Sequence, residues 1–322
     1  MRAVQVTRLD GPDAVEVGDV DEPVGGEGQV LIDVHAAGVT FPEVLLTRGQ
    51  YQIRPPLPFV PGSEVAGIVR SAPVDAAVRP GDRVAAFCGF GGFAEAVAAP
   101  VDAVFALPDD LDLAAGAALP MNYLTVHFAL LRRGRLQPGE TVLVHGAAGG
   151  IGTAAVQLAA ASGARVVAVV SDEAKAEVAR RAGAHEVVAV DGFKDAVLEL
   201  TDGRGVDVVV DPVGGDRFTD SLRSLAPEGR LLVVGFTAGE IPTVKVNRLL
   251  LNNIDVVGVA WGAFWLQQRD YLQQQWQDLL PHVRSGALLP PIGATYPLHR
   301  VVDALHDLDQ RRALGKVVLT VR

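Results

Sequence analysis

The chain has 322 residues, of which 49% are hydrophobic and 20% are charged, and its formal net charge is −10. This length favours two domains, and the acidic balance argues against a nucleic-acid partner. Charged, glycine or polar residues interrupt every apolar run before it reaches membrane-spanning length, so we expect no membrane partner. The first six residues read as a strand rather than a signal peptide, which predicts a cytoplasmic protein.

Cysteine and histidine usage argues against a metal centre. Cys88 is the single cysteine, so the chain can form neither an intrachain disulfide nor a multi-cysteine zinc site. The seven histidines show no metal-ligand spacing such as His-Glu-x-x-His. We therefore expect no bound metal, and we expect Cys88 to serve packing rather than chemistry.

The first 120 residues or so predict a small β-barrel. Short apolar runs alternate closely with turn residues, as in Gly11-Pro12 and Pro61-Gly62, which suits a barrel better than βαβ units. The expected strands are 2–8, 30–36, 64–69, 83–87 and 93–98.

From Thr141 to about Gly262, apolar strands alternate with amphipathic helices. The strands are near-continuous runs of Val, Ile and Leu, which is typical of strands covered on both faces. Six of them predict a doubly wound parallel sheet, at 142–144, 166–170, 187–190, 206–210, 231–234 and 254–259. Asp172 and Asp216 are the expected N-caps of two of the helices.

The glycine-rich stretch after the first of these strands, His145-Gly-Ala-Ala-Gly-Gly-Ile-Gly152, predicts a dinucleotide site. Gly149 lets the backbone approach a pyrophosphate, and Gly152 lets the following helix pack closely on the strands. Free N–H groups at that helix start hold phosphates. We expect Ala148, Gly149, Gly150 and Ile151 to bind the cofactor. The alternative is a nucleotide-free α/β domain with a tight turn, since Ala147 replaces the first glycine of the pattern.

After Gly262 the pattern predicts a helix over 267–280, a helix over 298–308 and a closing strand over 316–321. We expect this C-terminal tail to return to the first domain.

Several motifs, in this order and spacing, resemble the zinc-independent NADPH:quinone oxidoreductases of the medium-chain dehydrogenase/reductase superfamily, which are related to zeta-crystallin. They are Ala37–Glu43, Pro61–Glu64, Arg79–Val84, Leu124–Val126, Pro138-Gly139, His145–Gly152, Gly183-Ala184 and Asp211–Gly214. The resemblance covers the whole chain. It implies an α/β protein with a GroES-like β-barrel catalytic domain (1–121), a Rossmann NADPH-binding domain (122–261) and a C-terminal segment (262–322) that completes the first domain.

The zinc members of the superfamily differ from this chain at the metal ligands. Thr40 stands where their first catalytic cysteine would be, and Ser63 stands where their histidine would be. Without a Lewis acid, alcohol oxidation loses the stabilisation of its alkoxide. The resemblance therefore implies zinc-free hydride delivery to a quinone or another conjugated carbonyl.

The end of the second parallel strand predicts NADPH rather than NADH. NAD-binding folds place an acidic residue there on the ribose, whereas this chain has Val170 followed by Ser171 and Lys175. The resemblance implies that Lys175 binds the 2′-phosphate. The alternative is that Lys175 only faces solvent, with Asp172 capping its helix; one departure from some relatives is Val190 in place of a tyrosine.

The resemblance also implies which residues surround the nicotinamide. They are Thr125, Gly235, Phe236, Thr237, Val259 and Trp261. Gly235 follows an apolar strand, at the kind of strand end where such folds bind ligands. For Phe236 and Trp261 the alternative is burial for packing.

Three residues are candidates for the acceptor end. Thr40 and Glu43 stand where similar quinone reductases often carry Asn and Asp, and Tyr51 matches a tyrosine that enoyl-thioester reductases place near the substrate carbonyl. Thr40 could donate a hydrogen bond, and the Tyr51 phenol could stabilise an enolate or donate a proton. The alternative for Tyr51 is a surface loop. Arg48 could guide an anionic substrate, although we expect a solvated loop arginine.

Three functions remain open: NADPH:quinone oxidoreductase, NADPH-dependent enoyl-thioester or enone reductase, and a crystallin-like protein that binds NADPH without turnover. We expect the first. We also expect a homodimer that pairs the edge strands at 254–259, because an apolar sheet edge needs covering.

Overall fold

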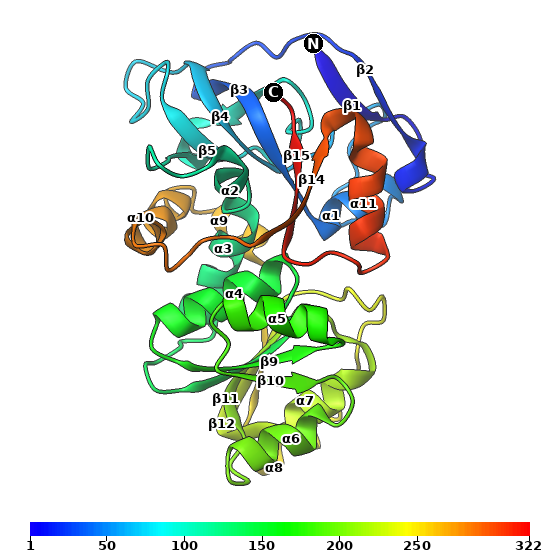
Figure 1. Ribbon diagram of the computed structural model, residues 1–322, viewed down its shortest axis with the longest axis vertical. Helices are drawn as coiled ribbons and strands as arrows, with labels where there is room; N and C mark the ends of the chain where they lie inside the picture. Colours follow the sequence, from blue (N-terminus) through cyan, green and yellow to red (C-terminus); the bar gives the residue numbers. More distant parts are fainter. The chain divides into compact units, whose positions relative to one another are not determined.

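The computed structural model describes residues 1–322, which form two compact units (Figure 1). Unit 1 comprises residues 1–121, 269–277 and 290–322, and unit 2 comprises residues 122–268 and 278–289. The residues from 262 onward are therefore shared between the units. Both chain ends lie in unit 1.

Unit 1 is built on a largely antiparallel sheet in the order β14-β15-β3-β4-β5-β7, with β6 paired to β3 and a separate β1-β2 hairpin. Only the β14-β15 pair is parallel. The strands are β1 (Arg2–Val6), β2 (Val15–Asp19), β3 (Gln29–Val39), β4 (Glu64–Ser71), β5 (Arg83–Phe87), β6 (Ala96–Pro100), β7 (Val104–Ala106), β14 (Ile292–Pro297) and β15 (Lys316–Thr320). This is the expected GroES-like domain, in which β2, β7 and β14 were not predicted.

The core of unit 1 follows the alternation of its strands. Along β3, Val30, Ile32 and Val34 are fully buried, and they alternate with partly exposed residues. Val317 and Leu319 of β15 and Leu305 of α11 (Val301–Asp309) complete the same core. Two short helices, α1 (Phe41–Thr47) and α2 (Leu113–Ala117), were not predicted.

Unit 2 contains the expected doubly wound sheet. Its six strands are all parallel, in the order β10-β9-β8-β11-β12-β13. The bounds are β8 (Thr141–His145), β9 (Arg165–Val170), β10 (Glu186–Ala189), β11 (Val206–Asp211), β12 (Leu225–Val233) and β13 (Asp255–Gly258). The order reverses direction between β8 and β11, which is the switch point where such sheets bind ligands.

Helices cover both faces of this sheet. α4 (Gly150–Ala161) and α5 (Glu173–Arg181) pack together against β8, β9 and β10 (Figure 1). α6 (Phe193–Leu200) and α7 (Phe218–Arg223) pack together. The right-handed crossover rule for parallel strands assigns them to the other face. Asp172 caps α5 as predicted, because its side chain accepts from the Lys175 N–H. Asp216 is not an N-cap: it lies within the short 3₁₀ turn Gly215–Arg217, so that prediction was wrong.

Of the remaining helices, three were not predicted and two differ from the expected ones at their ends. α3 (Pro120–His127) precedes the parallel sheet, α8 (Asn247–Asn252) precedes β13, and α9 (Trp261–Trp265) follows it. The helix expected over 267–280 is α10 (Tyr271–Arg284), which starts later. The helix expected over 298–308 is the 3₁₀ turn Leu298–Arg300 followed by α11.

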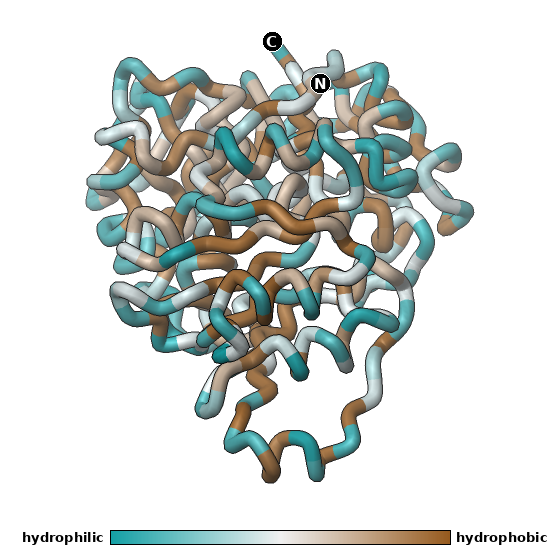
Figure 2. Tube along the Cα trace, turned by 60° about the horizontal axis from the view of Figure 1, so that its bottom comes forward, coloured by the Kyte–Doolittle hydropathy of each residue, from teal (hydrophilic) through white to brown (hydrophobic).

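Hydropathy follows this architecture. The apolar segments in Figure 2 run through the strands, and hydrophilic residues gather at turns and on outer helix faces. None of the helices has the combination of length and apolarity that crossing a bilayer would require.

Candidate functional site

The predicted cofactor residues of unit 2 gather at one edge of the parallel sheet. Ala148–Ile151 follow β8, Ser171 follows β9, Gly235–Thr237 follow β12, and Val259–Trp261 follow β13. Because the carboxyl ends of parallel strands meet at the same edge, the fold brings these segments together beside the switch point.

The turn from β8 into α4 depends on the absence of side chains. A Cβ on Gly152 would stand 2.1 Å from the Gly146 carbonyl oxygen and 2.6 Å from the Ala147 Cα, so only glycine fits there. A Cβ on Gly149 would meet nothing closer than the Gly146 oxygen at 3.5 Å, an ordinary contact. Gly152 is therefore required by the fold, whereas Gly149 leaves an open approach to the backbone.

Four amides at this turn are available to a ligand. The N–H groups of Ala148, Gly150, Ile151 and Gly152 make no hydrogen bond within the protein, and the first bonded amide of α4 is that of Thr153, at 2.8 Å from the Gly149 oxygen. The helix is twelve residues long and has no acidic residue in its first turn. Its N-terminus thus carries partial positive charge and unpaired donors, which fit a diphosphate.

A cation stands at the end of β9. The Lys175 Nζ donates to the Ser171 Oγ at 2.8 Å and lies 3.2 Å from the Asp172 Oδ2, and the lysine side chain is 25% exposed. The Lys175 N–H, followed by the Ser171 hydroxyl, lowers the pKa of Asp172. Lys175 is therefore folded back over the strand end, even though Asp172 also caps the helix. Ser171 and Lys175 together present donors of the kind that a phosphate accepts.

The residues predicted for the nicotinamide end differ in exposure. Thr125 on α3 is 8% exposed and Trp261 is 4% exposed, whereas Phe236 is 37% exposed. The Trp261 ring packs against Trp265, with ring centroids 5.9 Å apart. The Thr237 N–H donates to the Pro212 oxygen at 3.1 Å, which ties this turn to the segment after β11.

Asp211 fixes the conformation of the segment after β11. This role was not assigned to its motif from the sequence. Its buried carboxylate accepts from the N–H groups of Val213 at 2.8 Å and Gly214 at 2.9 Å. Burial raises the pKa of Asp211, and the two N–H groups oppose that shift. Asp211 therefore fixes the backbone beside the Gly235 turn. The Asp211-Pro-Val-Gly214 motif was the signal that could have identified it.

In unit 1, Thr40 and Glu43 form the N-terminal cap of α1. The Glu43 carboxylate is 1% exposed and accepts four hydrogen bonds, from the N–H and hydroxyl of Thr40 and from the N–H and hydroxyl of Ser63. The Ser63 hydroxyl lies 2.8 Å from Glu43 Oε1. Both polar groups predicted for substrate binding are thus engaged with each other, and Ser63 is a partner that the sequence did not identify.

Tyr51 differs from Thr40 and Glu43 in having no hydrogen-bond partner. The residue is half-buried, and its hydroxyl makes no hydrogen bond within the protein. Burial raises the pKa of the phenol, and the negative charge of Glu43 raises it further. Tyr51 therefore keeps its proton at neutral pH and can donate a hydrogen bond.

Arg48 is partly exposed, and its guanidinium is held by an ion pair rather than free to guide a substrate. Its guanidinium makes two hydrogen bonds to the Asp309 carboxylate of α11, at 2.8 and 2.7 Å. This bidentate geometry ties the loop that leads to Tyr51 to the last turn of α11. The sequence did not identify this ion pair, because Asp309 lies far along the chain from Arg48.

A buried ion pair lies behind the barrel motif Pro61–Glu64. Lys316 donates to Glu64 Oε1, and their side chains are 4% and 0% exposed. The other oxygen of Glu64 accepts from the Met121 N–H at 2.7 Å. Burial raises the pKa of Glu64, and Lys316 opposes that shift. This pair, which the sequence did not reveal, fixes β15 and the start of α3 to β4.

No group of three or more His, Cys, Asp or Glu side chains is arranged to hold a metal ion. Thr40 and Ser63, at the positions of zinc ligands in the zinc enzymes, both donate to Glu43 instead. The Cys88 thiol donates to the Gly62 oxygen at 3.4 Å, and burial raises its pKa.

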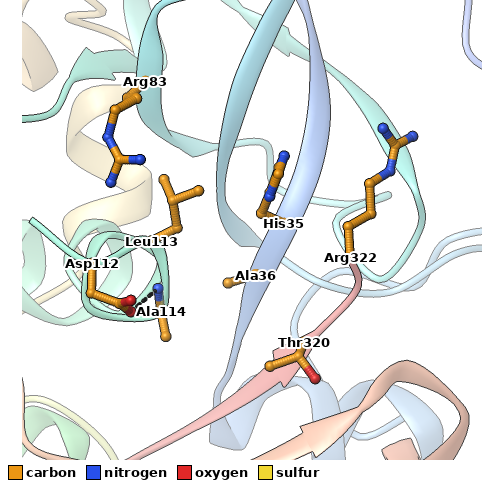
Figure 3. A pocket seen from close by; sticks show the side chains of 8 residues that line it. All are labelled: His35, Ala36, Arg83, Asp112, Leu113, Ala114, Thr320 and Arg322. Atoms are coloured by element: carbon orange, nitrogen blue, oxygen red, sulfur yellow. Dashed lines mark hydrogen bonds between the residues drawn. The ribbon is translucent and has the colours of Figure 1, made fainter. Parts of the chain in front are cut away.

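Unit 1 also contains a hollow of about 290 Å³, which includes none of the predicted residues (Figure 3). Its basic groups are largely occupied: Arg83 donates to the Leu111 oxygen, and Arg322 pairs with Asp33 at 3.1 Å. Burial, and then the charge of Arg322, lower the pKa of His35. Arg83 keeps its charge, since a carbonyl oxygen does not neutralise it, whereas Arg322 is paired with a carboxylate.

Comparison with known proteins shows the same two-part organisation. Residues 26–109 match the alcohol dehydrogenase GroES-like domain, and residues 150–285 match the family described as zinc-binding dehydrogenase. Quinone oxidoreductase-like protein 2 of Rattus norvegicus is 39% identical over 325 residues, which cover 100% of this chain and 92% of the relative.

Solved structures agree over the full length. A "probable oxidoreductase" from Mycobacterium abscessus has 47% identity and a TM-score of 0.92, with 100% of this chain and 99% of that chain covered. A mycobacterial protein complexed with NADPH has 34% identity and a TM-score of 0.92, with 100% of both chains covered. The chain therefore belongs to the quinone oxidoreductase family of the medium-chain dehydrogenase/reductase superfamily.

Proposed function

We propose that this protein is an NADPH-dependent, zinc-free reductase of a quinone or another conjugated carbonyl. The observation that carries the proposal is the set of unpaired amides at the start of α4 together with Lys175 at the end of β9. Unpaired donors at a helix N-terminus suit a diphosphate, and a lysine at the second strand end suits a 2′-phosphate. Relatives that bind NADPH support the same assignment.

Each part of the dinucleotide has residues in unit 2 that would hold it. The amides of Ala148, Gly150 and Ile151, beside the open approach at Gly149, would hold the diphosphate. Ser171 and Lys175 would hold the 2′-phosphate. Thr125, Gly235, Phe236, Thr237, Val259 and Trp261 would surround the nicotinamide. When bound, NADPH supplies a hydride.

Tyr51 is the residue of unit 1 that we assign to the acceptor. Hydride delivery to a conjugated carbonyl leaves negative charge on the carbonyl oxygen, and a neutral phenol stabilises that charge by donating a hydrogen bond. The unpaired hydroxyl and raised pKa of Tyr51 meet this requirement. Glu43 and Thr40 act as positioning residues, since Glu43 is buried and Thr40 donates to it.

Two other functions predict different outcomes in one experiment. An unpaired tyrosine hydroxyl also suits an enoyl thioester, and a crystallin-like protein would bind NADPH without turnover. Stopped-flow oxidation of NADPH should be compared for a quinone and a crotonyl thioester. Faster oxidation by the quinone supports the proposal, faster oxidation by the thioester supports an enoyl reductase, and oxidation by neither supports the binding protein.

Zinc independence follows from the engagement of Thr40 and Ser63 with Glu43. Activity should survive dialysis against a chelator, because the protein offers no ligand set for zinc at these positions. Stoichiometric zinc that is lost together with activity would contradict this part of the proposal.

We infer a homodimer from the exposed edge of the parallel sheet. β13 pairs with β12 on one side only, and α8 beside it exposes Leu250 and Leu251 at 77% and 74%. Val246 is 71% exposed in the same segment. An unpaired strand flanked by apolar side chains favours pairing with a second copy. A monomeric mass at micromolar concentration would contradict the inference. A cytoplasmic location and the lack of nucleic-acid and membrane partners stay predictions.

A further inference from the structure

Asn122, near the start of α3, is a buried polar residue without a partner. The residue is 5% exposed, and neither the Oδ1 nor the Nδ2 of its carboxamide makes a hydrogen bond within the protein. A carboxamide has two donor hydrogens and an acceptor oxygen. Its polar atoms are not among the fully enclosed side-chain atoms without a partner, so the carboxamide reaches the surface and is open to a ligand.

The carboxamide lies directly against the first residue of α4. A Cβ on Gly150 would stand 2.5 Å from the Asn122 Nδ2 and 3.2 Å from its Cγ. Gly150 carries one of the four unpaired amides of the turn after β8. The absence of a side chain at Gly150 therefore lets the Asn122 amide approach the N-terminus of the helix.

A second unpaired group follows on the same face of α3. Thr125 lies three residues after Asn122 in the helix, which places both side chains on one face. Thr125 is 8% exposed, and its hydroxyl makes no hydrogen bond within the protein. One face of α3 thus carries two nearly buried polar side chains without protein partners, and the first of them lies against Gly150.

We propose that Asn122 is a cofactor-binding residue whose Nδ2 donates a hydrogen bond to a diphosphate oxygen of the dinucleotide. The inference rests on the proposed function, because it adds a side-chain donor to the backbone donors at Gly150 and its neighbours. A carboxamide at this place is neutral and does not distinguish the 2′-phosphate from the 2′-hydroxyl. Asn122 therefore sets the affinity for the dinucleotide, while Lys175 sets the preference for NADPH.

The test compares three ligands by isothermal titration calorimetry. NADPH, NADH and 2′-phospho-ADP-ribose all contain the diphosphate, but 2′-phospho-ADP-ribose lacks the nicotinamide. Asn122→Ala should raise the Kd of all three by the same factor, about tenfold, as expected for one hydrogen bond to a charged group. Lys175→Ala is the matched control, since it should weaken NADPH and 2′-phospho-ADP-ribose but not NADH.

Asn122→Asp provides a second variant of nearly the same shape. A carboxylate near the N-terminus of α4 is compatible with the helix dipole, so the cofactor-free protein should fold. The same carboxylate would repel a diphosphate, and the Kd of all three ligands should rise more than in Asn122→Ala. The melting temperature of each variant without ligand confirms that the binding data refer to folded protein.

The outcomes separate the two proposals. If the unsubstituted protein does not bind NADPH, the proposed function fails. If it binds NADPH and both Asn122 variants bind equally well, Asn122 does not contact the cofactor and the inference is overturned. A loss for NADPH and NADH without a loss for 2′-phospho-ADP-ribose would assign the carboxamide to the nicotinamide half, which also overturns the diphosphate contact.

Discussion

Polar groups are left unpaired at the glycine turn of unit 2, but they are hydrogen-bonded to one another in the cluster of Thr40, Glu43 and Ser63 in unit 1. At the turn, four amides make no hydrogen bond within the protein. Around Glu43, one carboxylate accepts four hydrogen bonds, from the N–H and the hydroxyl of both Thr40 and Ser63.

Whether a polar group has a hydrogen-bond partner within the protein distinguishes groups that can bind a ligand from groups that stabilise the fold. A polar group that the protein leaves unpaired near its interior costs stability unless a ligand satisfies it. A group that the protein satisfies needs no ligand and mainly holds the chain in place. By this criterion Tyr51 and the turn amides are available to bind ligands, whereas Glu43 and Thr40 hold the start of α1 in place.

The largest expected effect concerns polar groups that are paired within the protein, namely the buried ion pair of Lys316 and Glu64. Lys316→Met leaves the buried Glu64 carboxylate without its cation, so the free energy of unfolding should fall by about 3–5 kcal/mol. Urea denaturation measures the change. Adding Glu64→Gln should recover part of the loss, because Gln keeps an acceptor for the Met121 N–H. A loss below about 1 kcal/mol in the single variant would show that the pair is not a structural requirement.

Tyr51→Phe tests the unpaired hydroxyl. The variant keeps the ring and removes only the donor, so kcat for a quinone or enone should fall by a factor on the order of 10 to 1,000. The Kd for NADPH and the stability should hardly change, because the hydroxyl has no partner in the protein. Single-turnover measurements exclude masking by product release. An unchanged rate there would remove Tyr51 from the reaction.

Two glycines of the same turn should respond differently to the same substitution. Gly152→Ala drives a methyl group into the Gly146 carbonyl and should cost about 3 kcal/mol or more of stability. Gly149→Ala meets only an ordinary contact at 3.5 Å, so its stability should change little while its affinity for NADPH falls. Thermal denaturation and cofactor titration of both variants measure the contrast. Equal stability losses would mean that Gly149 is a structural glycine as well.

Lys175→Ala tests whether Lys175 binds the 2′-phosphate of NADPH. Loss of a charge-assisted contact should weaken NADPH binding by about 1.5–3 kcal/mol. NADH lacks that phosphate and should bind with nearly unchanged affinity. Equal losses for the two cofactors would show that Lys175 does not read the phosphate, despite its position beside Ser171.

The last test concerns a buried histidine of unit 2, and the expected effect is absent at neutral pH and grows as the pH falls. Burial, followed by the charge of Arg217, lowers the pKa of His145 from 6.5 to about 3, and its Nε2 lies 2.8 Å from the Ser221 Oγ. The unfolded chain protonates first as the pH falls, so stability should decrease below pH 6.5 by up to about 1.4 kcal/mol per pH unit, until the folded state titrates near pH 3.

His145→Gln removes this titration and should show a shallower loss of stability with acid. Unfolding by urea at several pH values between 7 and 4 measures both slopes. If the two slopes are the same, other groups dominate the acid sensitivity.

The sequence predicted the regions where local pattern and fold agree. The strands of unit 2 are runs rich in β-branched residues, and all six were identified near their observed places. The inner strands β8, β9 and β11 are almost wholly buried, whereas the edge strands β10 and β13 are partly exposed. By contrast, β14 contains Gly293 and ends at Pro297, and its partner β15 follows across helix α11, so its local pattern carried little strand signal. The register of such a pairing depends on contacts that periodicity does not contain.

The site shows the same limit. Glycine spacing identified the turn after β8, because the backbone itself makes that site. Thr40 and Glu43 have the spacing of a capping box. The same residue types could equally bind a substrate through hydrogen bonds, so the sequence alone does not decide between the two roles. Their assignment depends on Ser63, which comes from another part of unit 1. The sequence did not single out Asn122, because the observation that draws attention to it is the missing hydrogen-bond partner of its carboxamide, which only the folded structure shows.

The position of β15 within its sheet bears on the order in which the chain can acquire structure. β15 lies between β14 and β3, and Val317 is paired with Val39. The parallel sheet of unit 2 comes from one continuous stretch, so it can form while the chain is still being synthesised. The barrel sheet is completed only after β15, at residues 316–320, has been synthesised. During that interval β3 exposes an apolar edge, so translation speed and chaperone access should influence the yield of unit 1 more than that of unit 2.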